Sequence, residues 1–340
     1  MTQKLTWLIA HHPAHLFIRT AEAFNAELNK RIPGQFEIEI LSFKEYLEQR
    51  GDIPELAIRP AAVKGLEEGE ATSTEDGAFV ASDWKDVQTK WKAFFNGIRD
   101  KKIHLSQTQV TVIGSHLFQK FKTLDLPFLF RDHDHVSDTL DGPIGDRLLN
   151  EMGDATGVRG LGYTYSGGYR IIGSNEEINS LSDLADLEMV TTPNTQMTFR
   201  NIAKDAKGRV FKSIETNGDD AVTGAVETTY LRFTGKNILK TEHSMFMTSI
   251  LVGDEFFNEL NEEQQNAFRE SAKVVAKLER KWSLEDAEKY EVEAESKGIK
   301  ITQISQEETA QLQEAAPSDY EFLYSKEPAA QDLVNEIKNH

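Results

Sequence analysis

The stretch LTWLIAHHPAHLFIRTAEAFNAELNKRIPGQFEIEIL, residues 5–41, decides the fold class. Residues 5–10 form a short apolar run typical of a strand, and apolar side chains recur at helical spacing through residues 16–31. A Pro-Gly pair then ends the helix, and residues 36–41 alternate between apolar and charged side chains, as a half-buried strand does. A strand, a helix and a second strand in this order predict an α/β domain.

The same patterns predict further elements along the chain. Residues 84–98 have helical periodicity, and the apolar run at residues 110–114 predicts a buried strand. Residues 261–294 predict a long helix with Asn261 as its N-cap. Residues 51–82 mix glycines with acidic side chains, which predicts an exposed excursion and leaves open that it folds over a site as a lid.

Length and composition limit the possible functions. A chain of 340 residues is too long for one ordinary core, which predicts two lobes. The 56 acidic and 38 basic side chains give a net charge of -18, which argues against nucleic-acid and anionic-membrane partners. The sequence has no cysteine, and no apolar run approaches the roughly 20 residues needed to cross a bilayer. We expect no cofactor, because the sequence contains no Gly-rich phosphate loop.

Five segments between residues 110 and 300 follow the order of one family's motifs. They are LDLPFLFRDHDH (124–135) with LDGPIG (140–145), GVRGLGY (157–163) with GYR (168–170), SLSDLADL (180–187), AVTGAVE (221–227), and TEHS (241–244) with residues 254–265. In this order they resemble the solute-binding proteins of TRAP transporters, the tripartite ATP-independent periplasmic family that is also called DctP-type.

The resemblance implies an α/β, two-lobe Venus-flytrap fold of the periplasmic-binding-protein type, with a long C-terminal helix that braces both lobes. Lobe I is expected to contain residues 1–161 and about 246–285, with 51–82 as an insertion. Lobe II is expected to contain residues 162–245 and about 286–340. Such a protein binds a small solute in the cleft, performs no chemistry on it and delivers it to the membrane subunits of a TRAP permease in the periplasm.

The resemblance also implies a mature, exported form whose signal peptide is absent from this sequence. We expect a monomer, and a dimer formed through the long helix stays open.

The position of Val190 predicts that the ligand is atypical for this family. In most members, the strand that follows the SLSDLADL segment ends in an arginine that binds a ligand carboxylate with two parallel hydrogen bonds. Counted from Leu187, this arginine falls on Val190. An ester, an amide, a polyol, an amine or a molecule with a less central carboxylate is therefore expected in place of a simple dicarboxylate.

Other ligand-binding residues are nominated by their positions in the family's motifs. Arg170 is the candidate for a surviving cation, with an arginine that bridges surface carboxylates as the alternative. Tyr230 and Leu231 occupy positions where Glu and Asn usually help to bind the ligand. Thr192 and Asn194 follow the strand that contains Val190, although an asparagine near a proline is also a common turn residue.

The ends of predicted strands supply the remaining candidates. His11 and His12 follow the first strand, and Ser115 and His116 follow the predicted strand 110–114. Loops at the carboxyl ends of strands tend to face a ligand. We therefore expect one residue of each pair in the cleft, with ordinary loop residues as the alternative.

A metal-dependent hydrolase remains the alternative function. Asp132 to His135, together with His11 and His12, have the residue types of a metal site. An aspartate followed by acidic and polar residues fits the start of a helix equally well. The sequence has neither a G-x-S-x-G nor an H-E-x-x-H motif, so the binding-protein reading is favoured.

Overall fold

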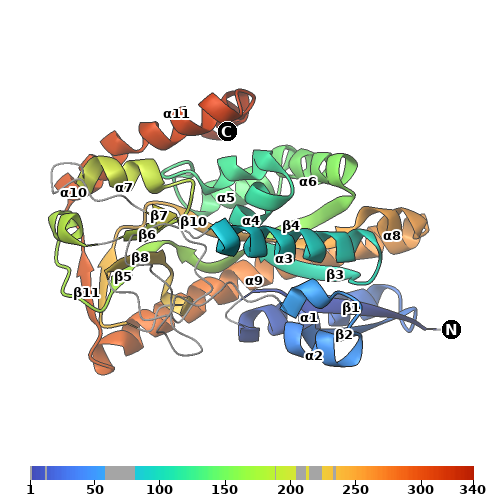
Figure 1. Ribbon diagram of the computed structural model, residues 1–340. Coiled ribbons are helices and arrows are strands. Elements are labelled where there is room, and N and C mark those ends of the chain that lie inside the picture. The colour runs from blue at the N-terminus through green and yellow to red at the C-terminus, as the bar shows by residue number, and fades with distance from the viewer. Residues whose placement is uncertain are drawn as a thin grey trace.

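The chain folds around two β-sheets that lie side by side (Figure 1). The computed structural model describes residues 2–11, 14–57, 81–187, 189–203, 212–213, 224–232 and 235–340. In Figure 1 most of the first sheet lies in the right half of the view, and the second sheet lies in the left half. The α/β class predicted from the sequence is confirmed.

Within the described ranges, the first sheet has five strands in the order β2-β1-β3-β10-β4. The strands are β1 (Gln3–Ile9), β2 (Phe36–Ser42), β3 (Leu105–Gln109), β4 (Val158–Tyr169) and β10 (Met245–Gly253). β1 is parallel to β2 and β3, whereas β10 is antiparallel to β3 and β4. The helices that accompany this sheet are α1 (Ala14–Arg31), α2 (Phe43–Gln49), η1 (Pro54–Ala57), α3 (Ala81–Arg99), α4 (Val110–His116), η2 (Gln119–Asp125), α5 (His133–Leu140), α6 (Pro143–Thr156) and α8 (Asp254–Glu259).

The second sheet has the order β11-β9-β5-β8-β6-β7 among the strands that the structure describes. Its strands are β5 (Ile171–Ser174), β6 (Met189–Thr191), β7 (Lys212–Ser213), β8 (Ala225–Thr228), β9 (Asn237–Lys240) and β11 (Lys300–Gln303). β6 is parallel to β7 and β8, so the carboxyl ends of these strands lie at one edge. The accompanying helices are η3 (Leu181–Asp186), α7 (Gln196–Ala203), η4 (Tyr230–Arg232) and α10 (Gln306–Ala315).

The chain passes between the two sheets several times. The first passage is at Arg170, which separates β4 from β5, and residues 241–244 bring the chain back from β9 to β10. The long helix α9 (Glu262–Ser296) then contacts β4 and α1 at the first sheet and η4 and β11 at the second. Asn261 is the N-cap of this helix, as predicted, and it also forms a capping box with Gln264. The expected helix that braces both halves is therefore present.

The last two helices pack with the first sheet's core. α11 (Pro317–Lys326), along the upper edge of Figure 1, and α12 (Ala330–Lys338) contribute side chains to the same core cluster as α3, α5 and α6. The Tyr320 hydroxyl donates to the backbone oxygen of Pro127 over 2.7 Å. We therefore propose that residues 317–340 belong to lobe I and that the first lobe boundary lies at Arg170. The predicted boundaries themselves stay predictions.

The predicted strand at residues 110–114 is wrong, because this run forms the buried helix α4. The strand beside β1 is formed by residues 105–109, in which Leu105 pairs with Trp7. This strand has a polar sequence, LSQTQ, although all five of its residues are buried. Its side chains make hydrogen bonds inside the sheet, such as that from the Ser106 hydroxyl to the Leu8 carbonyl, and hydropathy could not reveal that burial.

The other predicted elements agree with the structure. The predicted strands 5–10 and 36–41 and the helix 16–31 correspond to β1, β2 and α1, and the helix 84–98 corresponds to α3. Of the predicted excursion 51–82, residues 58–80 lie outside the described ranges. No helix among the described residues is long and apolar enough to span a membrane.

Glu279 is a buried carboxyl group where α9 packs on β4. Its Oε2 accepts a hydrogen bond from the backbone N–H of Tyr165 over 2.7 Å. Burial is the largest influence on this carboxyl and raises its pKa to about 8, although the hydrogen bond from Tyr165 and the charge of Arg280 act in the opposite direction. The folded protein therefore holds Glu279 in the neutral form at pH 7.

We expect the Glu279→Gln variant to lose part of the pH dependence of stability. The unfolded chain ionises this group near pH 4.5, whereas the folded chain keeps its proton to about pH 8. Between these values the folded state binds more protons, so wild-type stability should fall as pH rises, by at most about 1.4 kcal/mol per pH unit. Urea unfolding from pH 4.5 to 8 measures this slope. Glu288→Gln, at an exposed position of α9, is the control, and equal slopes in the wild type and Glu279→Gln would contradict the assignment.

Candidate functional site

Arg170 lies in the interior between the two sheets and is only 2% exposed. Its Nη2 donates to Oδ1 of Asp125 over 2.9 Å and to the hydroxyl of Thr111 over 3.2 Å. Asp125 ends η2 and Thr111 lies in the first turn of α4, so both partners belong to elements that accompany the first sheet. The guanidinium is thus a buried cation with a buried carboxylate partner.

The backbone around Arg170 explains why its side chain reaches this place. Gly167 and Gly168 precede the passage with φ angles of 93° and 75°, a conformation that favours glycine. A Cβ on Gly167 would lie 2.8 Å from Cβ of Thr229. The N–H of Arg170 donates to the Ser244 carbonyl, which ties the two chain crossings together over 2.8 Å.

Glu227 is the second buried carboxylate and comes from β8 of the second sheet. Its Oε2 accepts from the N–H of Thr192 and from the hydroxyl of Thr195, each over 2.6 Å. Its Oε1 lies 3.1 Å from Nε2 of His243 and 3.5 Å from Nε of Arg170. Glu227 therefore connects Arg170 to the loop that follows β6.

Glu227 is ionised despite its burial. Burial is the largest influence and would raise its pKa, but the hydrogen bond from His243, the charges of Arg170 and His243, and the hydroxyl of Thr195 together lower the pKa to about 2. An ionised carboxylate only accepts hydrogen bonds, so Nε2 of His243 is the donor. Nδ1 of His243 faces the Thr241 hydroxyl at 2.8 Å.

Asn194 joins the two sheets directly. Its Nδ2 donates to Oδ2 of Asp125 over 3.2 Å, and this oxygen also accepts from the Thr111 hydroxyl over 2.9 Å. Asn194 follows β6 and is 6% exposed, whereas Asp125 is fully buried. We name the set Asp125, Arg170, Asn194, Glu227 and His243 the interlobe cluster, because side chains from both sheets contribute to it.

An aromatic ring covers one side of the interlobe cluster. Phe246 of β10 lies under the Arg170 guanidinium, whose Cζ is 4.1 Å from the ring centroid. The Cζ of Arg232 lies 5.4 Å from the same centroid. His11 packs edge-on against this ring, with centroids 5.5 Å apart, and its Nδ1 lies 2.8 Å from the Gln109 amide nitrogen. Phe246 therefore brings two arginines and His11 together.

Several residues nominated from the sequence meet at the interlobe cluster or beside it. Arg170 and Asn194 belong to it, Thr192 bonds Glu227 through its backbone, and His11 reaches it through Phe246. Tyr230 and Leu231 lie in η4 directly after β8, where Tyr230 is buried against Tyr290 of α9. Their roles in ligand binding stay predictions.

The other nominated residues lie elsewhere or outside the described part of the chain. Ser115 and His116 end α4, one turn beyond Thr111, and the imidazole of His116 stacks on Trp91 of α3 with centroids 6.4 Å apart. Both residues lie in the last turn of a helix and do not follow a strand, which removes the reason for placing them in the cleft. His12 lies outside the described residues. Val190 lies in β6, where its backbone pairs with Val226.

Asp125, Glu227 and His243 were not nominated as site residues. The available signal was a charged residue inside a run that otherwise has the pattern of a buried strand, as in Ala225-Val-Glu227. A buried charge requires a partner, so such a residue marks a place where another charge must approach. The sequence alone does not show which of the many arginines provides it.

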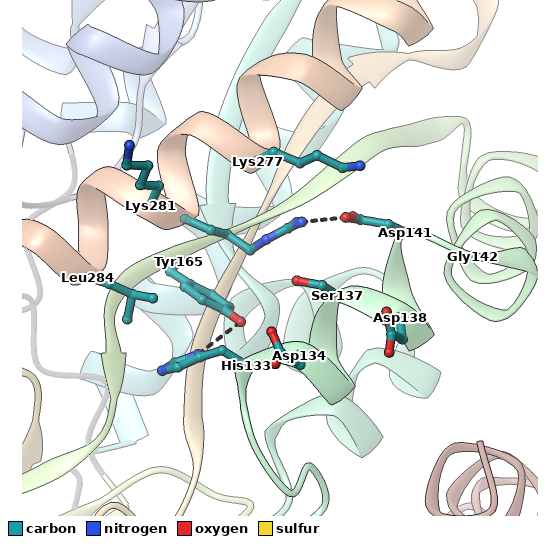
Figure 2. Close-up of a pocket in the computed structure, with 11 residues that line it drawn as sticks. His133, Asp134, Ser137, Asp138, Asp141, Gly142, Tyr165, Lys277, Lys281 and Leu284 are labelled. Atoms are coloured by element: carbon teal, nitrogen blue, oxygen red, sulfur yellow. Dashed lines mark hydrogen bonds and ion pairs between the residues drawn. The ribbon is translucent and has the colours of Figure 1, made fainter.

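A hollow of about 520 Å³ lies between α5, β4 and α9 (Figure 2). Asp134 and Asp138 of α5 and Lys277 and Lys281 of α9 border it, and each of these side chains is exposed. At its floor, Nδ1 of His133 lies 3.2 Å from the hydroxyl of Tyr165. The charged side chains around this hollow are of both signs and face solvent, as on an ordinary protein surface. We therefore place the candidate site at the interlobe cluster and not in this hollow.

The fold and the interlobe cluster define a class of two-lobed proteins that bind a small molecule between their lobes. The model of the bacterial extracellular solute-binding protein family 7, DctP, matches residues 92–327. The chain therefore belongs to this family, as the sequence motifs predicted.

Relatives and solved structures agree with this assignment. A solute-binding protein of Verminephrobacter eiseniae is 26% identical over 230 residues, which are 63% of this chain and 68% of that protein. The 2,3-diketo-L-gulonate-binding periplasmic protein of Escherichia coli is 26% identical over 223 residues, or 62% of this chain and 66% of that protein. The chain thus spans about two thirds of the length of both relatives.

A solved TRAP periplasmic solute-binding protein of Desulfovibrio desulfuricans, with bound sn-glycerol 3-phosphate, has a TM-score of 0.74 and 16% identity. The comparison covers 99% of this chain and 97% of that structure, which confirms the predicted two-lobe fold.

The metal-dependent hydrolase receives no support from these comparisons. Asp132 acts as the N-cap of α5, because its Oδ1 accepts from the N–H of His135 over 2.7 Å. His135 is buried, and its Nε2 lies 2.9 Å from the Ile337 carbonyl. Among the described residues, no group of three or more His, Asp or Glu side chains is placed to hold a metal ion.

Proposed function

We propose that this protein binds a small organic solute between its two lobes in the periplasm and delivers it to the membrane subunits of a TRAP permease. Family membership supports this role. Two of the similar proteins are named for, or hold, 2,3-diketo-L-gulonate and sn-glycerol 3-phosphate, which are small polyhydroxylated anions. The expectation that the solute differs from a simple dicarboxylate stays a prediction.

The interlobe cluster is the observation that carries the proposal. Asp125 comes from the first sheet's side, Asn194 and Glu227 come from the second, and Arg170 lies at the passage between them. A protein that closes on a solute needs polar groups of both lobes at the point where the lobes meet. Closure then brings these groups together around the solute, and the membrane subunits recognise the closed form.

A melting screen tests the proposal. The panel contains the anions D-galacturonate, L-gulonate, pantoate and sn-glycerol 3-phosphate, the neutral compounds D-galactose and glycerol, and the amines D-galactosamine and ethanolamine. A solute at about 100 times its Kd adds about 2.7 kcal/mol to the stability of the folded state. At this chain length, the midpoint of unfolding should rise by roughly 4 °C.

Two variants locate the binding site in the same screen. Asn194→Ala should reduce the shift, because it removes an amide at the meeting point of the lobes. Asn258→Ala, which changes an exposed asparagine of α8, should leave the shift unchanged. A screen without any stabilising compound, together with turnover of a generic ester or phosphate, would overturn the proposed function.

A further inference from the structure

A hollow of about 270 Å³ lies beside the passages of the chain between the sheets, and we call it the hinge hollow. Elements that accompany the first sheet contribute the loop between η2 and α5 and the start of β10. Elements of the second sheet's side contribute the end of β11 and residues of α10. The lining residues include Phe128, Tyr169, Met245, Gln303 and Gln313. The hinge hollow thus has walls on both sides of the hinge.

The hinge hollow is distinct from the interlobe cluster. Among the described residues that line it, none comes from β1, β6 or β8 or directly follows one of these strands. Those strand ends carry candidates for solute binding, such as Asn194 and Tyr230. His243 lines the hinge hollow and also reaches Glu227 over 3.1 Å, so the two places adjoin at this residue. A molecule in the hinge hollow and a solute beside Asn194 therefore occupy different places.

Apolar side chains form a large part of the walls. Leu126, Leu129, Phe130 and Met245 are buried lining residues. The half-buried ring of Phe128 packs against core clusters of both sheets. The volume corresponds to about nine water molecules, each of which occupies about 30 Å³ in the liquid, so one six-membered ring with a short substituent fits. Such a ring removes apolar wall surface from water, which favours its binding.

The charges beside the hinge hollow are already matched or solvated. Oε1 of Glu242 lies 3.6 Å from Nζ of Lys240, and the Arg131 side chain is exposed. In contrast, the hydroxyl oxygen of Ser244, another lining residue, is buried and has no hydrogen-bond partner in the described part of the chain. A buried hydroxyl without a partner is unfavourable, and a hydroxyl group of a bound molecule can supply one. These walls therefore favour an uncharged molecule that carries a hydroxyl group.

Two residues that line the hinge hollow have an unusual backbone conformation. Phe128 and Glu242 have φ angles of 53° and 48°, and among the described non-glycine residues only Lys101 shares a positive φ. The N–H of Phe128 donates to the His243 carbonyl over 2.7 Å, which joins the two segments. Such a conformation is unfavourable for a residue with a side chain, and it persists mainly at binding and switch regions. The geometry of the hinge hollow is therefore tied to that of the hinge.

We propose that the hinge hollow is a second binding site, which takes a small uncharged molecule with an apolar ring and a hydroxyl group, and that its occupant favours one arrangement of the two lobes. This site goes beyond the proposed function, because the solute is held elsewhere. Its walls come from both sides of the hinge, so a movement of the lobes changes its shape and its affinity for the occupant. By linkage, the occupant changes the affinity for the solute by the same factor.

Three probes that share one ring test the chemistry of the site: benzyl alcohol is uncharged, benzylamine is a cation and benzoate is an anion. The methyl group of Met245, one of six methionines, is followed by NMR in each titration. Benzyl alcohol should shift this signal with a Kd of about 1 mM or below, and should bind about ten-fold more tightly than the charged probes, whose charges would lack a partner. No saturable shift with benzyl alcohol, or an equal affinity for a charged probe, would overturn the proposal.

Substitutions on α10 locate the site. Gln313→Trp places a large side chain at the hinge hollow and should weaken the binding of benzyl alcohol at least ten-fold. Gln311→Trp makes the same change at an exposed position of the same helix outside the hollow, and it should leave the Kd unchanged. Thr309→Trp, at a half-buried lining position, is the second test. Wild-type affinity in both Gln313→Trp and Thr309→Trp, or an equal loss in Gln311→Trp, would overturn the proposal.

Distance measurements test the effect on the lobes. Because the sequence has no cysteine, Glu48→Cys on α2 and Glu307→Cys on α10 introduce unique labelling sites at exposed positions. Saturating benzyl alcohol should shift the distribution of spin-label distances, and adding Gln313→Trp should abolish this shift. An unchanged distribution would overturn the effect on the lobes. The melting screen with solutes is independent of these probes, so the proposed function stands even if the second site fails.

Discussion

Replacing Arg170 by methionine is expected to lower the free energy of unfolding by about 3–5 kcal/mol, because it removes the guanidinium that faces two buried carboxylates. Asp125 and Glu227 have fully buried side chains, and Arg170 is the guanidinium that faces both. The methionine side chain has a length similar to that of arginine, so the loss of stability reflects the missing charge more than the missing volume. Urea unfolding at pH 7 measures the effect.

The pH dependence of this loss has a defined sign. The pKa of Glu227 is about 2 in the folded protein, below the 4.5 of an ordinary glutamate, so its stabilising contribution is complete above pH 4.5 and is lost as pH falls through about 2. Arg170 is one cause of the low pKa. The difference in stability between the wild type and Arg170→Met should therefore shrink as the pH is lowered from 4.5.

Two comparisons make the Arg170 prediction specific. Arg50→Met removes an exposed arginine that pairs with Glu39 over 2.6 Å, and it should cost at most about 1 kcal/mol. Adding Asp125→Asn and Glu227→Gln to Arg170→Met should recover part of the lost stability, because the interior then holds fewer unpaired charges. A loss no larger than that of Arg50→Met would show that solvent reaches the interlobe cluster.

Replacing Asp319 by alanine is expected to cost about 2–4 kcal/mol, because the start of α7 loses its hydrogen-bond acceptor. Asp319 lies on α11 and is 1% exposed. Its Oδ1 accepts from the N–H of Met197 over 2.9 Å, and its Oδ2 accepts from the N–H of Thr198 over 2.7 Å and from the Thr198 hydroxyl. The carboxylate thus joins the C-terminal helices to the second sheet's side.

Asp319 should act as a carboxylate at pH 7. Burial is the largest influence and raises its pKa to about 6, although the hydrogen bonds from Thr198 and Met197 lower it. Asp319→Asn keeps one accepting oxygen and should lose less stability than Asp319→Ala. Asp332→Ala, at an exposed position of α12, is the matched control. Unchanged hydrogen exchange at the Met197 and Thr198 amides in Asp319→Ala would contradict this role.

Most of the fold could be predicted from local patterns. The alternation in residues 36–41 and the helical spacing in residues 16–31 depend only on neighbours along the chain, and both predictions are confirmed. The long helix was also predictable, because Asn261 and the following acidic residues mark its start. The prediction of a strand at residues 110–114 was wrong, because the adjacent polar residues 105–109 form the strand that pairs with β1. A local pattern cannot show which of two neighbouring segments enters the sheet.

The candidate site was only partly predictable. Arg170 was nominated from a family motif, and Asn194 and Thr192 were nominated from their positions after the strand that contains Val190. The structure brings these three residues together. Asp125 was part of a quoted motif but was not nominated as a site residue. Arg232 follows the nominated Tyr230 and Leu231 and was passed over, because the sequence does not show that its guanidinium lies beside Phe246.

The sequence by itself determined the α/β class, the long bracing helix and the family, because each depends on periodicity or on motifs within a few dozen residues. It also showed that Val190 occupies the position where most members of the family have an arginine. Only the tertiary structure decided which charges meet. Asp125, Arg170 and Glu227 are far apart along the chain, and their pairing exists only because two sheets approach each other at the chain crossings and exclude water from three charged groups.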